Sequence, residues 1–303
     1  MPVLGCRTAI VLRRADASRW GARRMSSTNK WPDIRKVTLD DLNEAVVAGI
    51  SDFRAYPSYG IAIGLALAAG GWLMFFILSE MDLPFLIWPL AMGFAFVAPF
   101  AASAFYAVSD LRERGEPVTL AAVWAGLSRE HHRRDLGWMA LLTFLALIFW
   151  LEIAAVLTFA FAGINTFDTG YLSKLLDSPS GWFFLLMGNV AGAAIGFTVF
   201  AVTVISFPML YHRDTDFITA MVTSVRLVEK NPITMIAWAL FIGFIVVLSV
   251  LTAFLGLLVL LPIIGHSTWH LYRLSVEPVR ASLPAEIAKP RGVEMISGRL
   301  VEG

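Results

Sequence analysis

The apolar part of this sequence contains one clear acidic residue, Glu152, within the stretch Trp138–Gly163. A carboxylate inside a membrane-spanning helix costs at least about 2.5 kcal/mol on insertion scales, so it faces other helices and has a partner. Asn189, in the next apolar stretch, is expected at a similar depth because consecutive spans run antiparallel. The two residues predict either a structural hydrogen bond from a protonated Glu152 or a site that binds a proton or another ligand.

Two histidines, His266 and His270, lie four residues apart and would share one face of a helix. This spacing is compatible with a metal ion or haem iron. The neighbouring Trp269, Tyr272 and Arg273 favour a different interpretation, in which this segment anchors the chain at the membrane surface and the histidines form hydrogen bonds.

Glycines recur at four-residue spacing in two apolar stretches. Gly188, Gly192 and Gly196 form one stripe, and Gly60 and Gly64 form a shorter one. Small residues at this spacing allow helix backbones to approach closely, so we predict helix packing at both stripes. The alternative is a substrate path lined by glycine.

Common catalytic motifs are missing from the sequence: a phosphate-binding glycine loop, a nucleophile elbow, an HExxH helix and a CxxC pair. Cys6 is the one cysteine, which excludes an internal disulfide and a cysteine-based metal site. These observations favour a non-catalytic protein without a cofactor, with haem at the two histidines as the alternative.

The elements that must position these residues are membrane helices. The chain has 303 residues, 57% of them hydrophobic, a mean hydropathy of +0.70 and only 16% charged residues, against about 25% in soluble domains. A span needs about 20 apolar residues, and the sequence offers six such stretches: Tyr59–Leu78, Phe85–Val108, Trp138–Gly163, Gly181–Leu210, Ile233–Val250 and Ala253–Tyr272. The last two run together, so the chain must fold back near Ser249–Thr252.

Positive charges sort strictly between the connections. Of the 24 Lys and Arg residues, all but Lys174 fall in the two terminal segments and in the alternate connections 109–137 and 211–232. The positive-inside rule therefore predicts six spans with both termini in the cytoplasm. The basic clusters lie beside a membrane, so anionic lipid headgroups are expected partners and nucleic acid is not.

An internal repeat accompanies the spans. The segments around Ala45, Ala122 and Ala220 resemble one another, and Asp41, Ala45 and Pro57 match Asp216, Ala220 and Pro232 at a constant offset of 175. Each copy predicts a short amphipathic helix followed by a transmembrane hairpin. The short helices lie either in the membrane interface or packed on the bundle.

Each predicted hairpin has a proline in its second span, and these three prolines indicate a shared bend: Pro99, Pro208 and Pro262. The domain organisation follows: a basic tail over 1–36, one transmembrane domain over 37–278 and a cytoplasmic tail over 279–303. The first tail is expected to be disordered or spurious, with Met25 as an alternative start to Met1.

The sequence resembles a family of prokaryotic integral membrane proteins catalogued as domain of unknown function 2189. The resemblance covers roughly residues 35–278 and rests on Phe105–Glu116, on Tyr211–Asp214 through Asn231-Pro232, and on Gly265–Arg273. It implies a bacterial inner-membrane location and no particular activity. Some relatives are labelled cytochrome c oxidase subunit I-like, but the five histidines of this chain cannot supply the six that the catalytic subunit needs.

Three functional hypotheses follow from the sequence. The first is a scaffold, assembly factor or accessory subunit, with a respiratory or other membrane complex as its partner. The second is a small transporter or channel that uses Glu152, since repeats and broken helices occur in transporters. The third is a haem- or metal-binding membrane protein that uses His266 and His270.

Overall fold

The computed structural model describes residues 32–81, 89–91, 98–162, 173 and 176–276, without the side chains of residues 130–133. Four of its helices are long and apolar enough to cross a membrane, by length and composition: Pro57–Glu80, Arg134–Phe161, Pro179–His212 and Pro232–Leu251. An all-helical membrane protein is therefore confirmed. Several predictions fall partly or wholly outside the described residues. They are the span Phe85–Val108, most of both tails, both candidate start residues and Lys174.

The described chain consists of helices of very different lengths. From the N-terminal side, the elements are α2 (Leu39–Ala55), α3 (Pro57–Glu80), α5 (Ala98–Glu113), α6 (Leu120–Leu127), α7 (Glu130–Leu157), η3 (Thr158–Ala162), α9 (Pro179–Thr203), α10 (Ser206–His212), α11 (Phe217–Lys230), α12 (Pro232–Leu251), η4 (Leu255–Leu258) and α13 (Leu260–Ser275).

Local sequence signals set many of the helix starts. Thr38 and Asp41 form a capping box at the start of α2, with the Thr38 backbone N–H donating to Asp41 at 2.7 Å. Thr119, Ser178 and Asp216 cap the starts of α6, α9 and α11 with their side chains. The helices α3, α9 and α12 each begin with proline, which has no N–H to leave unsatisfied in a first turn.

The helix is broken between α12 and α13, because the apolar stretch from Ile233 to Tyr272 is too long for one membrane crossing. α12 ends at Leu251, and Ala253 and Phe254 adopt left-handed backbone conformations before the short helix η4. The Phe254 N–H donates to the Ser249 carbonyl at 2.7 Å, which satisfies one of the free carbonyls of the helix end. The predicted break near Ser249–Thr252 is confirmed.

The predicted bends take the form of helix starts. Pro208 is the third residue of α10, and Pro262 is the third residue of α13. Each of these helices follows a break in the helical conformation. Proline lacks a backbone donor and is tolerated in a first turn, whereas in a helix interior it removes a hydrogen bond. Pro99 is the second residue of α5 as the structure describes it.

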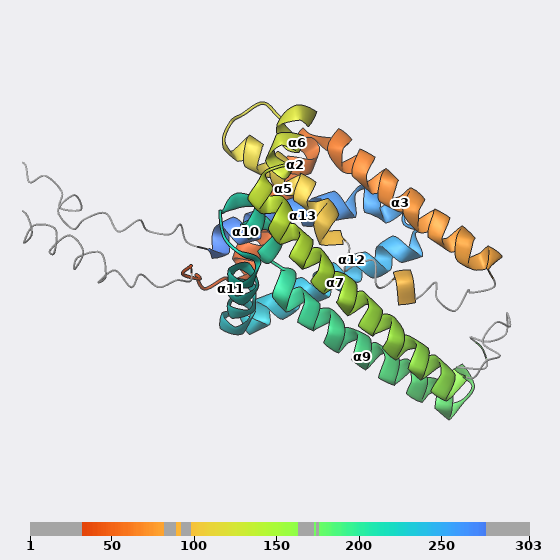
Figure 1. The fold of residues 1–303 in the computed structure, drawn as a ribbon. Helices are drawn as coiled ribbons and strands as arrows, with labels where there is room; N and C mark the ends of the chain where they lie inside the picture. Colours follow the sequence, from red (N-terminus) through yellow and green to blue (C-terminus); the bar gives the residue numbers. More distant parts are fainter. Residues whose placement is uncertain (1–31, 82–88, 92–97, 163–172, 174–175, 277–303) are drawn as a thin grey trace, which may run out of the picture.

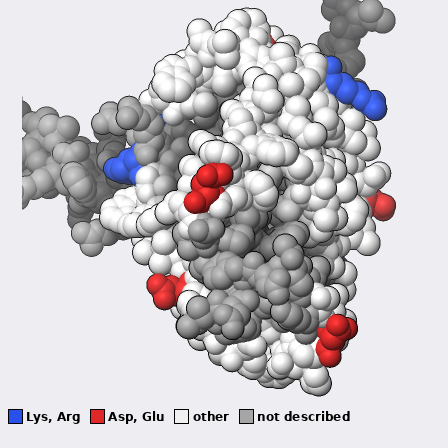
Figure 2. Space-filling view, turned by 90° about the vertical axis from the view of Figure 1, so that its right-hand side faces the viewer, with Lys and Arg blue, Asp and Glu red and all other residues white. Residues whose placement is uncertain are grey.

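The short helices gather at one end of the long ones (Figure 1). We call this the short-helix end, formed by α2, α6, α10 and α11. The helices α7 and α9 pack side by side, and α3 diverges from them. The visible part of the face at the far ends of the long helices is formed mostly by uncharged side chains, with a few scattered acidic and basic groups (Figure 2).

Helix α13 packs along α2 more extensively than any other pair of helices does. The contact is closest at Gly49, where an added Cβ would lie 2.6 Å from the Ser267 backbone nitrogen. The buried face of α2 comprises Leu42, Ala45, Gly49 and Asp52, whereas Leu39 remains 57% exposed. α2 therefore packs on the bundle through its small residues and leaves part of its apolar face outward.

Candidate functional site

A cavity of about 730 Å³ lies between the long helices. Its wall comes from α5, α9, α12 and α13, with Trp150 contributed by α7. The residues that α9 contributes run from Gly188 to Val204, which is about 24 Å at 1.5 Å per residue. The cavity is therefore elongated along α9, in the part of the chain that is apolar enough to cross a membrane.

The glycines of α9 line this cavity. At Gly188 and Gly196 an added Cβ would meet no other atom within 4 Å, and at Gly192 it would lie 3.0 Å from the Trp150 ring. The glycines of α3 are in a different environment: an added Cβ would lie 2.8 Å from Pro262 at Gly60 and 2.5 Å from the Leu258 Cα at Gly64. The shorter stripe thus lies in a helix contact, and the longer stripe faces open space.

The cavity wall is apolar and, over the described residues, carries no charged side chain. Several of its polar side chains donate to backbone carbonyls. Asn189 donates to Leu185 at 2.8 Å, Thr203 to Val199 at 2.7 Å, and Trp150 to Pro89 at 2.9 Å. These bonds leave few polar groups facing the space.

Glu152 and Asn189 are not brought together. Glu152 is exposed on α7 and does not line the cavity, whereas Asn189 does. No hydrogen bond joins the two, and the Asn189 amide donates within its own helix. A glutamate two residues after Trp150 on a helix turns away from the face that Trp150 presents to the cavity, which explains the separation.

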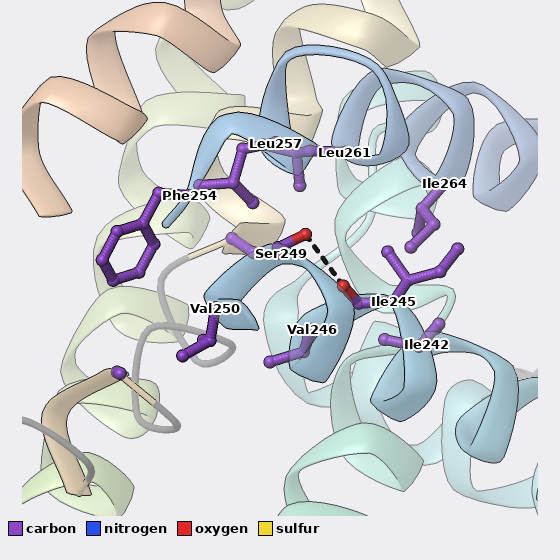
Figure 3. A pocket seen from close by; sticks show the side chains of 11 residues that line it. Ile242, Ile245, Val246, Ser249, Val250, Phe254, Leu257, Leu261 and Ile264 are labelled. Carbon is purple, nitrogen blue, oxygen red and sulfur yellow. Dashed lines mark hydrogen bonds between the residues drawn. The ribbon is translucent and has the colours of Figure 1, made fainter. Parts of the chain in front are cut away.

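A second, smaller cavity of about 70 Å³ adjoins the first (Figure 3). The two share Ala98, Ile242, Val246, Leu261 and Ile264 in their walls. Ser249 also lines the smaller space, but its hydroxyl donates to the Ile245 carbonyl at 2.8 Å. The apolar character of the wall therefore continues toward the turn between α12 and η4.

A buried carboxylate, Asp52 of α2, joins three helices near the short-helix end. Asp52 is 2% exposed and pairs with Arg112 of α5. Its Oδ2 accepts hydrogen bonds from Ser109 at 2.5 Å and from His270 Nε2 at 2.8 Å. Ser109 in turn lies 2.7 Å from Nδ1 of the fully buried His266. We call these residues, Asp52, Ser109, Arg112, His266 and His270, the Asp52 cluster.

Ionisation of Asp52 is controlled by opposing effects. Burial opposes the charged form, but hydrogen bonds from His270, Ser109 and Arg112 outweigh it and lower the pKa of Asp52 to about 2. The carboxylate is therefore charged over the physiological range, and it holds α2 against α5 and α13.

The histidine pair belongs to this hydrogen-bond cluster. His266 and His270 both approach Asp52, at 3.9 Å and 2.8 Å, and engage Ser109 and Asp52 rather than each other. Within the described residues, no group of three or more His, Cys, Asp or Glu side chains is placed to hold a metal ion. A haem or metal role for the pair stays a prediction from its spacing.

Sequence reasoning missed Asp52, Ser109 and Arg112. The signal was present on α2, because Asp52 follows Gly49 and Ala45 on one helical face. An acid on a face of small residues indicates a close partner, but the partner itself lies on helices distant in sequence.

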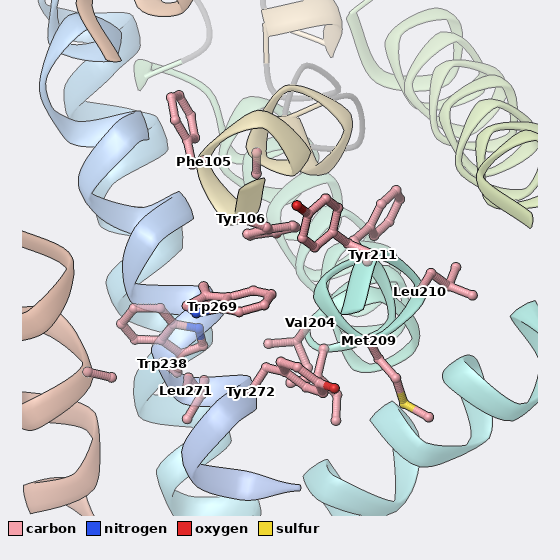
Figure 4. Close-up of a cluster of buried hydrophobic side chains, with 14 of the residues drawn as sticks. Phe105, Tyr106, Val204, Met209, Leu210, Tyr211, Trp238, Trp269, Leu271 and Tyr272 are labelled. Carbon is pink, nitrogen blue, oxygen red and sulfur yellow. The ribbon is translucent and has the colours of Figure 1, made fainter. Parts of the chain in front are cut away.

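An aromatic cluster adjoins the cavity at Tyr106. Tyr106 stacks on Trp269 with ring centroids 6.4 Å apart, and Tyr211 meets the same ring edge-on (Figure 4). Trp269 and Tyr272 are 0% and 1% exposed. The interpretation of these two residues as a membrane-surface anchor is wrong, because the fold buries them against other helices of the same chain.

Carboxylates beside this cluster are also paired. Glu113 accepts from Trp269 Nε1 at 3.2 Å and from Arg273 at 2.7 Å. Asp110 accepts from Arg114 at 2.9 Å and from the Tyr211 hydroxyl at 3.4 Å. These pairs hold the C-terminal half of α5 in place. The same half of the helix carries Ser109 and, one turn earlier, Tyr106.

The chain was compared with protein families, curated proteins and solved structures. A family described as "Predicted integral membrane protein (DUF2189)" matches residues 86–212, a shorter range than the resemblance seen in the sequence. No curated protein and no solved structure matches the chain. Over residues 86–212 the resemblance is thus confirmed: this part of the chain is similar to a family of predicted integral membrane proteins, and the long apolar helices agree with that description.

Proposed function

We propose that this protein is a non-catalytic accessory protein of the bacterial inner membrane that holds a lipid-like molecule in the cavity between α5, α9, α12 and α13. The cavity carries this proposal. Its volume of about 730 Å³ falls within the range of about 300–1,000 Å³ typical of small-molecule sites. An apolar, elongated space among membrane helices favours an occupant with a long hydrocarbon chain.

The topology that we propose has six crossings. The four long helices supply four of them, and α5 and the η4–α13 segment supply the others. α13 has 16 residues and η4 has four, which together give about 32 Å and suffice for a hydrocarbon core about 30 Å thick. The order of one interfacial helix followed by two proposed crossings recurs three times, as α2–α3–α5, α6–α7–α9 and α11–α12–α13, which supports the repeat seen in the sequence.

Both termini are proposed to be cytoplasmic. The Arg35 N–H donates to the Ser275 carbonyl at 2.8 Å, beside the bridge between Ile34 and Val276. Two segments in direct contact lie on the same side of a membrane, so an even number of crossings separates them. The sorting of Lys and Arg residues supports the cytoplasm as that side.

The short helices are proposed to rest in the cytoplasmic membrane interface while packing on the bundle. Leu120 and Trp124 of α6 are 75% and 71% exposed, and Ile218 of α11 also points outward. Apolar side chains at this level beside Arg112, Arg114 and Arg129 suit contact with acyl chains and anionic headgroups.

A transport role receives less support. Glu152, the one residue predicted to couple transport, lies outside the cavity wall and is exposed. If it couples transport, Glu152→Gln abolishes a substrate- or proton-dependent phenotype.

Two variants test the binding function. Gly196→Leu places a side chain in the open space of the cavity, whereas Gly70→Leu adds the same side chain to α3 at another position with no atom within 4 Å. The protein is purified in mild detergent, and the bound lipids are extracted and measured by mass spectrometry. We expect a stoichiometric lipid on the wild type and on Gly70→Leu, and its loss from Gly196→Leu. Equal lipid on both variants would contradict the proposal.

A further inference from the structure

The polar groups of the cavity wall indicate which class of molecule it holds. Five lining side chains carry a hydrogen-bond donor: Tyr106, Trp150, Asn189, Thr203 and Thr268. All but Tyr106 donate to a backbone carbonyl of the protein, including Thr268, which donates to Ile264 at 2.8 Å. Among the described residues, the Tyr106 hydroxyl has no hydrogen-bond partner.

Tyr106 is held in place without using its hydroxyl. The side chain is 2% exposed and its ring stacks on Trp269, which is itself fixed by Glu113 (Figure 4). The Tyr106 hydroxyl is not among the fully enclosed atoms that lack a partner, so it is reachable from the cavity. A hydroxyl that faces an apolar space without a hydrogen bond is unfavourable. An acceptor on a molecule in the cavity would remove that cost, because Tyr106 lines the cavity wall.

The wall also offers no counter-charge to a charged headgroup inside the cavity. No described residue that lines the cavity is ionisable apart from Tyr106 itself. A phosphate or carboxylate would lose its hydration on entering the cavity and would find no counter-charge there. This costs far more free energy than burying a neutral polar group. The charged side chains nearby, Glu113 with Arg273 and Asp52 with Arg112, are already paired with one another.

We infer that the cavity takes a neutral amphiphile whose apolar chain runs along α9 and whose carbonyl oxygen accepts a hydrogen bond from Tyr106. This inference rests on the proposed binding function and adds the chemical class of the ligand. Ester lipids without phosphate and long-chain quinones share this chemistry. Tyr106 and Tyr211 of α10 pack on the same Trp269 ring, which places Tyr106 toward the end of α9 that leads into α10. The carbonyl end of the ligand therefore lies at that end of the cavity, and the chain points toward Asn189.

The test uses photoreactive probes with the same alkyl chain on the full-length protein in lipid nanodiscs. One probe is a monoacylglycerol, one an alkylquinone, one a lysophosphatidic acid and one a plain alkane. We expect the monoacylglycerol or the quinone to label the wild type most strongly and the lysophosphatidic acid to label it weakly. The stronger of the two carbonyl probes shows whether the cavity prefers an ester or a quinone. Either preference supports the inference.

Tyr106→Phe isolates the hydrogen bond, because it keeps the ring and its stack on Trp269. A net hydrogen bond of about 1 kcal/mol corresponds to a roughly fivefold change in affinity. We expect Tyr106→Phe to weaken the preferred carbonyl probe about fivefold and to leave the alkane probe unchanged. Thermal unfolding of each variant shows that the fold is intact.

The outcomes separate the two proposals. If Tyr106→Phe weakens all probes equally or none, or if the lysophosphatidic acid labels as well as the neutral probes, the inference is overturned while lipid binding stands. If Gly196→Leu leaves labelling by every probe unchanged, or no probe labels the wild type, the binding function itself is overturned and the inference falls with it.

Discussion

At the scale of single residues, Asp52 shows how a buried charge is held in this fold. Its carboxylate is buried and accepts from Ser109, Arg112 and His270 on two other helices. A buried charge is tolerated only where its lone pairs are used, so each of these partners matters to the others. The cluster is a structural clamp between α2, α5 and α13.

We predict that Asp52→Ala destabilises the protein by about 3 kcal/mol, because it leaves His270 and Arg112 without their acceptor. Arg112 is partly exposed and recovers some hydration, which keeps the loss below that of a fully buried pair. The measurement is thermal unfolding in detergent. Glu44→Ala, on an exposed position of the same helix, is the matched control and should change stability little. Equal midpoints for the two variants would remove Asp52 as a clamp.

The same residue makes stability depend on pH. The folded state lowers the pKa of Asp52 to about 2 from its ordinary value of 3.8. A lowered pKa means that the unfolded chain binds the proton more readily, so the stabilisation is complete above about pH 4. It is lost as the pH falls from about 4 toward 2. We predict a drop in unfolding temperature over this window that is smaller in Asp52→Ala, and parallel curves for the two proteins would contradict it.

At the scale of secondary-structure elements, the two glycine stripes have different roles. The α3 stripe lies against the turn of η4 and the start of α13, where Gly64 approaches the backbone of Leu258. The α9 stripe faces the cavity, and only Gly192 meets a side chain, that of Trp150. The same spacing therefore serves close packing in one helix and an open wall in another.

We predict that Gly64→Ala destabilises the protein by about 1–3 kcal/mol, because the added Cβ would lie 2.5 Å from a backbone atom that cannot rotate away. Gly188→Ala should be neutral or slightly stabilising, since alanine is the better helix former. Thermal unfolding of the two variants compares the stripes directly. A larger loss at Gly188 than at Gly64 would reverse the assignment.

At the scale of the whole molecule, membrane topology determines which surfaces meet lipid and which meet water. The described N-terminal and C-terminal segments touch through Ile34 and Val276. The basic connections and the short helices share one end in the proposed arrangement, and the largely uncharged face of Figure 2 lies at the other.

We predict that residues 116 and 174 lie on opposite sides of the inner membrane. In a Cys6→Ser background, a membrane-impermeant maleimide should label Lys174→Cys in cells with a permeabilised outer membrane. It should label Glu116→Cys, which replaces a half-exposed side chain in the connection after α5, only after the inner membrane is opened. Labelling of both from outside would refute the six-crossing topology. Labelling of both in detergent confirms that the cysteines are accessible.

Much of the fold could be predicted from the sequence because its causes are local. The capping box at Thr38, the prolines that begin α3, α9 and α12, and the break after Leu251 all act within a few residues. Hydropathy is also a local sum, so the long apolar helices were evident from the sequence alone. The bend predicted at Pro208 became an interruption between α9 and α10, because proline has no N–H to donate to the carbonyl of Val204 four residues earlier.

By itself, the sequence determined that this is a helical membrane protein, where most of its described helices begin and where its charges are sorted. Only the tertiary structure decided that His270 meets Asp52, 218 residues away, that Glu152 and Asn189 stay apart, and that Tyr106 faces a cavity. The physical reason is that capping and hydropathy depend on neighbours in the chain. Close packing, open space and buried ion pairs depend on which helix face meets which, and a single sequence does not encode that locally.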